Sequence, residues 1–269
     1  MNKAKILFIS QEMTPYLPES EISLISRNLP QGIQELGKEI RTFMPRYGKI
    51  NERRHQLHEV IRLSGMNLII DDTDHPLIIK VASIQQARMQ VYFIDNEDFF
   101  HRKFVHTDED GNFFSDNDER MIFFARGVIE TVKKLRWTPD IIHCHGWFTS
   151  FIPMLIKKVY ADDTFFQDAK IVLSLYNNKF DKILNKDVKQ KLVNEGIKKT
   201  DLELLSNPTF ENLSKSIINE ADGVIIASKD IDDELIDYTN KKGKMMLEYQ
   251  DEENYINEYS KFYDKLLNI

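Results

Sequence analysis

Short apolar, β-branched runs alternate with longer amphipathic stretches along most of this chain. The runs are too short to be helices, so each is predicted to be a buried strand. Strands that alternate with helices indicate a parallel sheet with helices on both faces. The pattern therefore predicts an α/β fold with a doubly wound parallel sheet. The six expected strands are Lys5–Ser10, Glu39–Pro45, Val91–Asp95, Asp140–His145, Lys170–Leu175 and Gly223–Ser228.

The amphipathic stretches predict the helices. The first covers about Ser20–Leu36, because Ser20 can act as its N-cap and Gly37 follows its end. The clearest covers about Asp116–Arg136, where apolar residues recur every three or four positions, acids occupy the first turn and basic residues the last. Further helices are expected over Lys182–Gly196, Thr209–Ala221, Asp230–Tyr238 and Glu252–Leu267.

The pattern changes between Tyr47 and Gln90. Three segments there resemble short strands, at His55–Leu63, Met66–Asp71 and Leu77–Ile84. They predict a small β-rich insertion at about residues 50–90. Because the chain contains no internal repeat and no Gly/Ser-rich linker, we expect a single domain over residues 1–269, closed by the helix at about 252–267.

Charge and composition exclude several classes of function. The chain has 36 Lys and Arg against 43 Asp and Glu, a net charge of −7, which argues against nucleic-acid or anionic-membrane partners. Cys144 is the one cysteine, so an intrachain disulfide is excluded and a reducing cytoplasm is expected. No apolar run is long enough to span a bilayer. The ten glycines form neither a dinucleotide fingerprint nor a P-loop, so a phosphate would have to be held without a glycine-rich cradle.

The end of the first strand leads through Glu12 to the first helix. In an open parallel sheet, ligands bind at the carboxyl ends of the strands, and a helix N-terminus favours phosphate. Here Glu19 and Glu21 flank that helix N-terminus. Two carboxylates stabilise the helix themselves and repel an anion. A self-capped helix without a ligand is therefore favoured at this position.

His143, Cys144, His145 and Trp147 lie at the end of another predicted strand. The two histidines share a face of the strand. A metal site would need a third ligand that the spacing does not indicate, so we predict no metal, no cofactor and core packing for His143. A sugar-binding role is the intermediate interpretation, because Trp147 can stack on a pyranose ring.

Three other groups of polar or aromatic residues have competing explanations. Asn177 follows the Lys170–Leu175 strand, where an Asn can bind sugar hydroxyls but equally forms turns. The acids Asp116, Asp118 and Glu119 can do acid–base work, but a solvated helix N-terminus explains them more simply. Aromatic residues near the C-terminus keep helical spacing and are expected to pack on the sheet rather than bind a ligand: Tyr255, Tyr259 and Phe262, followed by Leu266.

Several segments, taken in order, resemble glycosyltransferase family 5, the bacterial glycogen synthases and plant starch synthases. The resemblance runs from about Lys5 to Ser228 and implies a Rossmann-like domain of the GT-B N-terminal type. Family members transfer glucose from ADP-glucose to an α-1,4-glucan with retention, and the resemblance covers only their N-terminal, acceptor-side domain. The segments are Lys5–Ser10 with Glu12, Met13 and Pro15, then Leu29–Pro30, Met44–Gly48, Val91–Asp95, Asp116–Arg120, Pro139–Trp147 and Ala221–Val224.

The chain departs from the family where the donor would bind. Family members begin the first helix with Lys-Thr-Gly-Gly-Leu-Ala-Asp, whose lysine and glycines hold the donor phosphates. This chain has Pro-Glu-Ser-Glu-Ile-Ser-Leu there. It also has Phe148 and Tyr176 where family members have histidines. The resemblance thus marks a degenerate donor site made of Pro18, Glu19, Ser20, Glu21, Leu24, Phe148 and Tyr176.

The resemblance implies a stand-alone glycogen-synthase-like domain that lacks autonomous glucosyltransferase activity and acts in glucan binding or regulation. No catalytic residue is assigned, and the expected contacts to an α-glucan or sugar are Glu12, His145, Trp147 and Asn177. Two alternatives stay open. One is the acceptor-side half of a split, retaining ADP-glucose or UDP-glucose glucosyltransferase with a separate donor-domain partner. The other is a structural interaction protein with a filled cleft. A homodimer is a further option, since loss of the family's C-terminal domain would expose a face that must be covered or made polar.

Overall fold

The strands form one sheet, which the computed structural model describes for residues 3–269. Its order is β10-β9-β8-β7-β1-β2-β6-β5-β3, with β4 beside β5. Residues 1 and 2 of the predicted 1–269 domain lie outside that range. The strands are β1 (Lys5–Ser10), β2 (Glu39–Pro45), β3 (His58–Glu59), β4 (Met66–Ile70), β5 (Thr73–Ile84), β6 (Met89–Asp95), β7 (Ile141–His145), β8 (Lys170–Leu175), β9 (Gly223–Ile226) and β10 (Met245–Leu247).

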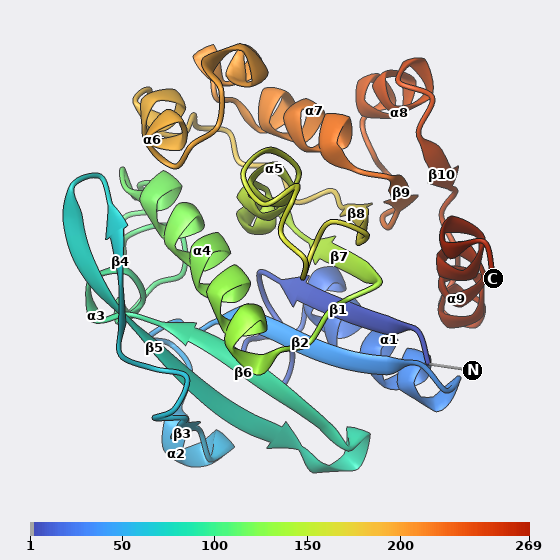
Figure 1. The fold of residues 1–269 in the computed structure, drawn as a ribbon, viewed down its shortest axis with the longest axis horizontal. Coiled ribbons are helices and arrows are strands. Elements are labelled where there is room, and N and C mark those ends of the chain that lie inside the picture. Colours follow the sequence, from blue (N-terminus) through green and yellow to red (C-terminus); the bar gives the residue numbers. More distant parts are fainter. Residues whose placement is uncertain (1–2) are drawn as a thin grey trace.

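Helices cover both faces of the sheet (Figure 1). α4, α5 and α7 lie on one face, while α1 and α9 lie on the other and contact each other. Among residues 3–269, no helix combines the length and the apolar character that crossing a bilayer requires. The helices are α1 (Glu21–Glu35), α2 (Glu52–His55), α3 (Glu97–Phe100), α4 (Asn117–Leu135), α5 (Phe151–Lys158), α6 (Val188–Asn194), α7 (Phe210–Glu220), α8 (Asp233–Lys241) and α9 (Tyr255–Leu267).

The central strand β1 shows why the apolar runs are continuous. It pairs in parallel with β2 on one side and β7 on the other. Leu7 and Ile9 pack into the cluster beneath α4 and α5, whereas Ile6 and Phe8 pack into the cluster beneath α1 and α9. A parallel strand that is buried on both faces needs apolar residues at nearly every position. The predicted doubly wound parallel sheet is confirmed from β10 to β6.

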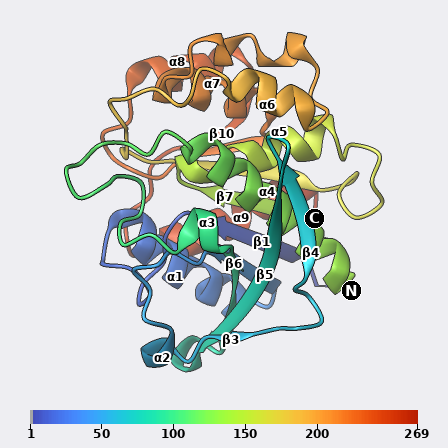
Figure 2. The ribbon, with the colours of Figure 1, turned by 90° about the vertical axis from the view of Figure 1, so that its left-hand side faces the viewer.

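The β-rich insertion is confirmed, although its details differ from the prediction. β5 is twelve residues long and pairs antiparallel with β6, β4 and β3 (Figure 2). The predicted strand at His55–Leu63 is wrong over most of its length, because only His58–Glu59 pairs. Asn51 caps a short helix just before it by accepting from the Arg54 N–H at 3.0 Å. The helix takes His55 out of the predicted strand, and a turn in which the Leu63 N–H donates to the Val60 carbonyl at 2.9 Å ends the strand at its other side.

Besides the one-turn helices α2 and α3, the sequence pattern missed α5 and β10. α5 is only eight residues long and begins with six consecutive buried residues from Phe151 to Ile156, so its sequence is a short run that cannot be told from a buried strand by pattern alone. β10 is a three-residue edge strand beside β9. Both lie in sequence between elements that were expected, and neither changes the topology of the central strands.

The closing helix α9 lies directly on the sheet, and Gly223 of β9 makes that approach possible. A Cβ at this position would lie 2.8 Å from two ring atoms of Phe262 and 2.9 Å from Leu266. Both side chains are buried, so neither can move away without disturbing the core. The absence of a side chain at Gly223 therefore sets the distance between α9 and the sheet.

We expect Gly223→Ala to lower the free energy of unfolding by about 1–3 kcal/mol, because the added methyl overpacks the interface between the sheet and α9. Urea denaturation measures this loss. Adding Phe262→Leu gives the methyl room, so a double-mutant cycle should show a favourable interaction between the two substitutions. Wild-type stability of Gly223→Ala would contradict the tight contact.

Candidate functional site

The carboxyl ends of β1, β7, β8 and β9 meet near the N-terminus of α1. We call this surface the strand-end edge and define it by Glu12, Glu21, Asn177 and Ser228. The parallel order of these neighbouring strands brings their ends to one side of the sheet. Residues more than 200 positions apart in the chain therefore become neighbours here.

The N-terminus of α1 is satisfied by its own side chains. The Ser20 hydroxyl accepts from the Ser23 N–H at 3.0 Å, and the Ser23 hydroxyl accepts from the Ser20 N–H at 2.8 Å. The Ser20 hydroxyl also donates to the Glu12 carboxylate. This capping box uses N–H groups that a phosphate would otherwise contact. Pro18 and Glu19 are exposed beside it, and Leu24 is half-buried one turn further on.

Glu21 links α1 to the ends of two strands. Its carboxylate accepts a hydrogen bond from the Ser228 hydroxyl, just after β9. The same hydroxyl oxygen accepts from the Asn177 N–H at 3.0 Å, just after β8. Glu12 lies nearby and is half-buried, and burial raises the pKa of its carboxyl, although the hydrogen bond from Ser20 lowers it in part. The edge therefore carries fixed acceptors and negative charge where a diphosphate would need donors.

The two histidines of β7 lie side by side in the core, as their spacing predicted, with ring centroids 4.0 Å apart. His143 lies within hydrogen-bond distance of the Tyr263 hydroxyl (2.7 Å) and the Ser174 hydroxyl (2.8 Å). His145 Nδ1 lies 2.8 Å from the Tyr176 hydroxyl, while its Nε2 has no partner among the described residues. Burial lowers the pKa of His145 to about 3 and that of His143 well below its usual range. Both rings are therefore neutral.

Aromatic side chains fill the space beneath the strand-end edge. Trp147 is buried against Phe180, with ring centroids 4.9 Å apart. Phe148 is fully buried next to His106, and Tyr176 is buried over His145. Of the expected sugar contacts, the structure therefore leaves Glu12 and Asn177 at the surface and places His145 and Trp147 below it. Within residues 3–269, no three His, Cys, Asp or Glu side chains group as metal ligands.

The acidic cluster at the start of α4 is not solvated, which corrects the simplest expectation. Asp116 pairs with Arg102, whereas Asp118 and Glu119 both pair with Lys191. Asp118 is fully buried, and burial raises its pKa to about 6. The ion pairs allow the carboxylates to leave water, and a cluster held in this way serves the packing of α4 against α6.

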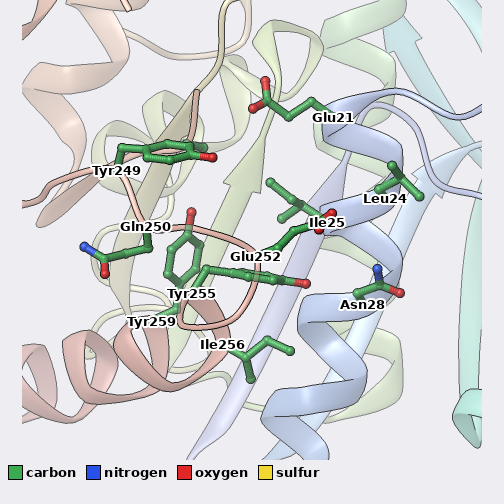
Figure 3. A pocket seen from close by; sticks show the side chains of 11 residues that line it. Glu21, Leu24, Ile25, Asn28, Tyr249, Gln250, Glu252, Tyr255, Ile256 and Tyr259 are labelled. Atoms are coloured by element: carbon green, nitrogen blue, oxygen red, sulfur yellow. The ribbon is translucent and has the colours of Figure 1, made fainter. Parts of the chain in front are cut away.

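A pocket lies between α1 and the segment that runs into α9; it adjoins the strand-end edge, with which it shares Glu21, and we call it the α1–α9 pocket (Figure 3). Its volume is about 530 Å³. Tyr255 and Tyr259 pack against the sheet as predicted, and they also form part of the wall of the pocket. The sequence signal that could have indicated this pocket is the pair Gln250 and Glu252, which lies between Tyr249 and Tyr255. The lining residues are Glu21, Leu24, Ile25, Asn28, Ala227, Tyr249, Gln250, Glu252, Tyr255, Ile256 and Tyr259.

We expect the stability of the chain to depend on pH through His145. The folded chain keeps this ring neutral down to a pKa of about 3, whereas the unfolded ring takes up a proton near pH 6.5. The free energy of unfolding therefore falls as the pH falls below about 6.5. Between pH 7 and pH 5 wild type should lose about 2 kcal/mol more than His145→Gln, as measured by urea denaturation.

Two features make this comparison specific. Asp118, whose pKa is raised, acts in the opposite direction, but it is present in both proteins and cancels. His58→Gln removes an exposed ring and should keep the wild-type pH dependence. Equal losses in wild type and His145→Gln would mean that His145 is not held neutral.

Comparisons with known proteins identify a matching family and several relatives of this chain. The family model described as the starch synthase catalytic domain matches residues 5–248. Glycogen synthases of Chlorobium limicola and Chlorobium phaeobacteroides are each 40% identical over 194 residues, covering 72% of this chain and 40% of their own length. That of Chlorobaculum parvum is 34% identical over 225 residues, covering 77% and 46%. The chain thus spans less than half the length of these relatives.

The fold also matches a solved structure. The catalytic domain of starch synthase IV from Arabidopsis thaliana, bound to ADP and acarbose, superposes with a TM-score of 0.74 at 18% identity. The match covers 93% of this chain and 52% of that one. It confirms the α/β fold expected from the family resemblance.

Proposed function

Because the chain belongs to the starch synthase catalytic-domain family, we propose that it is a glycogen- or starch-synthase-like domain that binds an uncharged α-glucan and does not by itself transfer glucose from ADP-glucose. Its role in glucan metabolism would then be binding or regulation. The strand-end edge is the proposed contact surface, with Glu12 and Asn177 at the surface and His145 and Trp147 supporting it from below.

One observation carries this proposal: the carboxylate of Glu21 occupies the first turn of α1 and is held there by Ser228. Glucosyl transfer requires donors or cations that neutralise the charge developing on the leaving diphosphate. A misplaced negative charge 4 Å away is unfavourable by about 4 kcal/mol at an effective dielectric of about 20. The nearby Lys179 is exposed and pairs with Asp232 at 3.0 Å, so its charge is already partly offset.

An uncharged sugar meets none of these obstacles. Sugar hydroxyls donate to carboxylates and both donate to and accept from amides. The half-buried Glu12 carboxylate and the exposed Asn177 amide offer such groups at the strand-end edge. The same features that repel a diphosphate are therefore compatible with a neutral glucan.

We expect maltoheptaose at millimolar concentration to give binding heat in calorimetry and to raise the melting temperature, whereas ADP should do neither. Asn177→Ala should weaken maltoheptaose binding about three- to tenfold, because it removes the exposed amide while keeping the backbone hydrogen bond to Ser228. Asn67→Ala, an exposed position on β4 far along the sheet, is the matched control.

A transfer assay completes the test. Purified protein should incorporate no glucose from ADP-glucose or UDP-glucose into glucan. Incorporation by the purified chain would refute the proposal, and incorporation that appears only with cell extract would favour a split enzyme. Absence of any maltoheptaose heat or melting shift would instead favour a structural protein with a filled cleft.

A further inference from the structure

The α1–α9 pocket combines tyrosine rings with carboxylate and amide side chains, whereas none of the four residues that define the strand-end edge carries an aromatic ring. We propose that it is a second saccharide site, which takes one or two glucosyl units of a neutral α-glucan. This inference rests on the proposed function, since it assigns the same class of ligand to a pocket that adjoins the strand-end edge and shares Glu21 with it. Tyr249, Tyr255 and Glu252 are the residues on which it depends most.

The pocket is formed by two elements that meet only in the folded chain. α1 supplies Glu21 and Asn28 on one side, and the segment after β10 supplies Tyr249 and Glu252 on the other. Figure 3 shows Glu21 reaching from the first turn of α1 toward Tyr249 across the pocket. Its volume of about 530 Å³ lies within the range of about 300–1,000 Å³ that is usual for small-molecule sites.

The α9 wall of the pocket is held in place before any ligand binds. Tyr255 and Tyr259 are 8% and 2% exposed, so their rings have little freedom to reorient. α9 is anchored to the sheet through the hydroxyl of Tyr263 and His143 Nδ1, 2.7 Å apart. It is anchored to the chain before β2 through Lys38 and Asp264, whose charged atoms are 2.8 Å apart. A preorganised wall lowers the entropic cost of binding.

The lining matches both the apolar C–H face and the polar hydroxyl groups of a pyranose ring. Tyrosine rings provide rigid apolar faces against which the C–H face of a sugar can pack. Asn28 and Gln250 can both donate to and accept from hydroxyls, and Glu252 accepts. Burial raises the pKa of Tyr255 to about 12, so its hydroxyl remains a neutral donor.

The charges around the pocket favour a neutral ligand over an ion. Glu21 and Glu252 repel an anion such as a sugar phosphate. Two cations of the chain already lie near the tyrosines: the Lys229 ammonium is 5.6 Å from the Tyr249 ring centroid, and Arg27 lowers the pKa of Tyr255 in part. An external amine would therefore be repelled by Lys229 and Arg27 as it approached these tyrosines.

The test uses the full chain and maltotriose and maltoheptaose as probes. Tyr249→Leu should weaken the binding of both about tenfold in calorimetry, because it removes an aromatic wall. Tyr238→Leu is the matched control, since Tyr238 is also half-buried and also has a lysine ammonium near its ring, but it lies on α8 outside the pocket. Methyl NMR of Ile25 and Ile256, which line the pocket, should show shifts on adding maltotriose.

The outcomes separate this inference from the proposed function. If Tyr249→Leu binds like Tyr238→Leu while Asn177→Ala binds weakly, the pocket is not a sugar site and the strand-end edge stands. If Asn177→Ala binds normally and Tyr249→Leu weakly, the pocket stands and the edge falls. Methyl shifts with spermidine but not with maltotriose would make the pocket a cation site and overturn the inference. If wild type binds no glucan, the proposed function fails, and the inference fails with it.

Discussion

The hydrogen bond between Ser228 and the carboxylate of Glu21 is the constraint on which the site depends. It places a negative charge at the N-terminus of α1, where the partial positive charge of the helix stabilises it. Because Ser228 also accepts from the Asn177 N–H, the same contact fixes the ends of β8 and β9 relative to α1. One group is thus proposed to act on both stability and ligand choice: the Glu21 carboxylate in the first turn of α1 interacts favourably with the helix and would disfavour a diphosphate.

Burial of aromatic and histidine side chains is the second determinant. Phe148 and Tyr176 fill the volume beneath the strand-end edge, so a ligand there meets only groups at its surface. The imidazoles of His143 and His145 stay neutral because burial lowers the pKa of both rings, and the hydroxyls of Tyr263 and Tyr176 lie beside them. One of those hydroxyls comes from Tyr263 on α9, which makes the closing helix part of the core as well as a wall of the α1–α9 pocket.

The chain belongs to the starch synthase catalytic-domain family, and the proposed loss of the donor site concerns the start of α1 rather than the scaffold. The segments that resemble the family are largely buried strands and the turns that follow them, where packing restricts the choice of residue. Pro18, Glu19 and Glu21 at the start of α1 are exposed, so other residues can stand there in place of the family's lysine and glycines without loss of the fold. A capping serine and two carboxylates are a locally favourable replacement, because they satisfy the helix N-terminus without a ligand.

The sequence predicted the strands of the parallel core, most of the amphipathic helices and the self-capped start of α1, because each follows from local periodicity or from residues three positions apart. Lys5–Ser10 and Lys170–Leu175 have the predicted bounds. It could not show α5, a short buried run that the pattern does not distinguish from a strand, or the burial of Asp118, which depends on Lys191 more than 70 positions away. Only the tertiary structure decided that Glu21 meets Ser228 and that the tyrosines of α9 border a pocket with α1, since side chains so distant in sequence become neighbours only when the sheet and its two helix layers pack together.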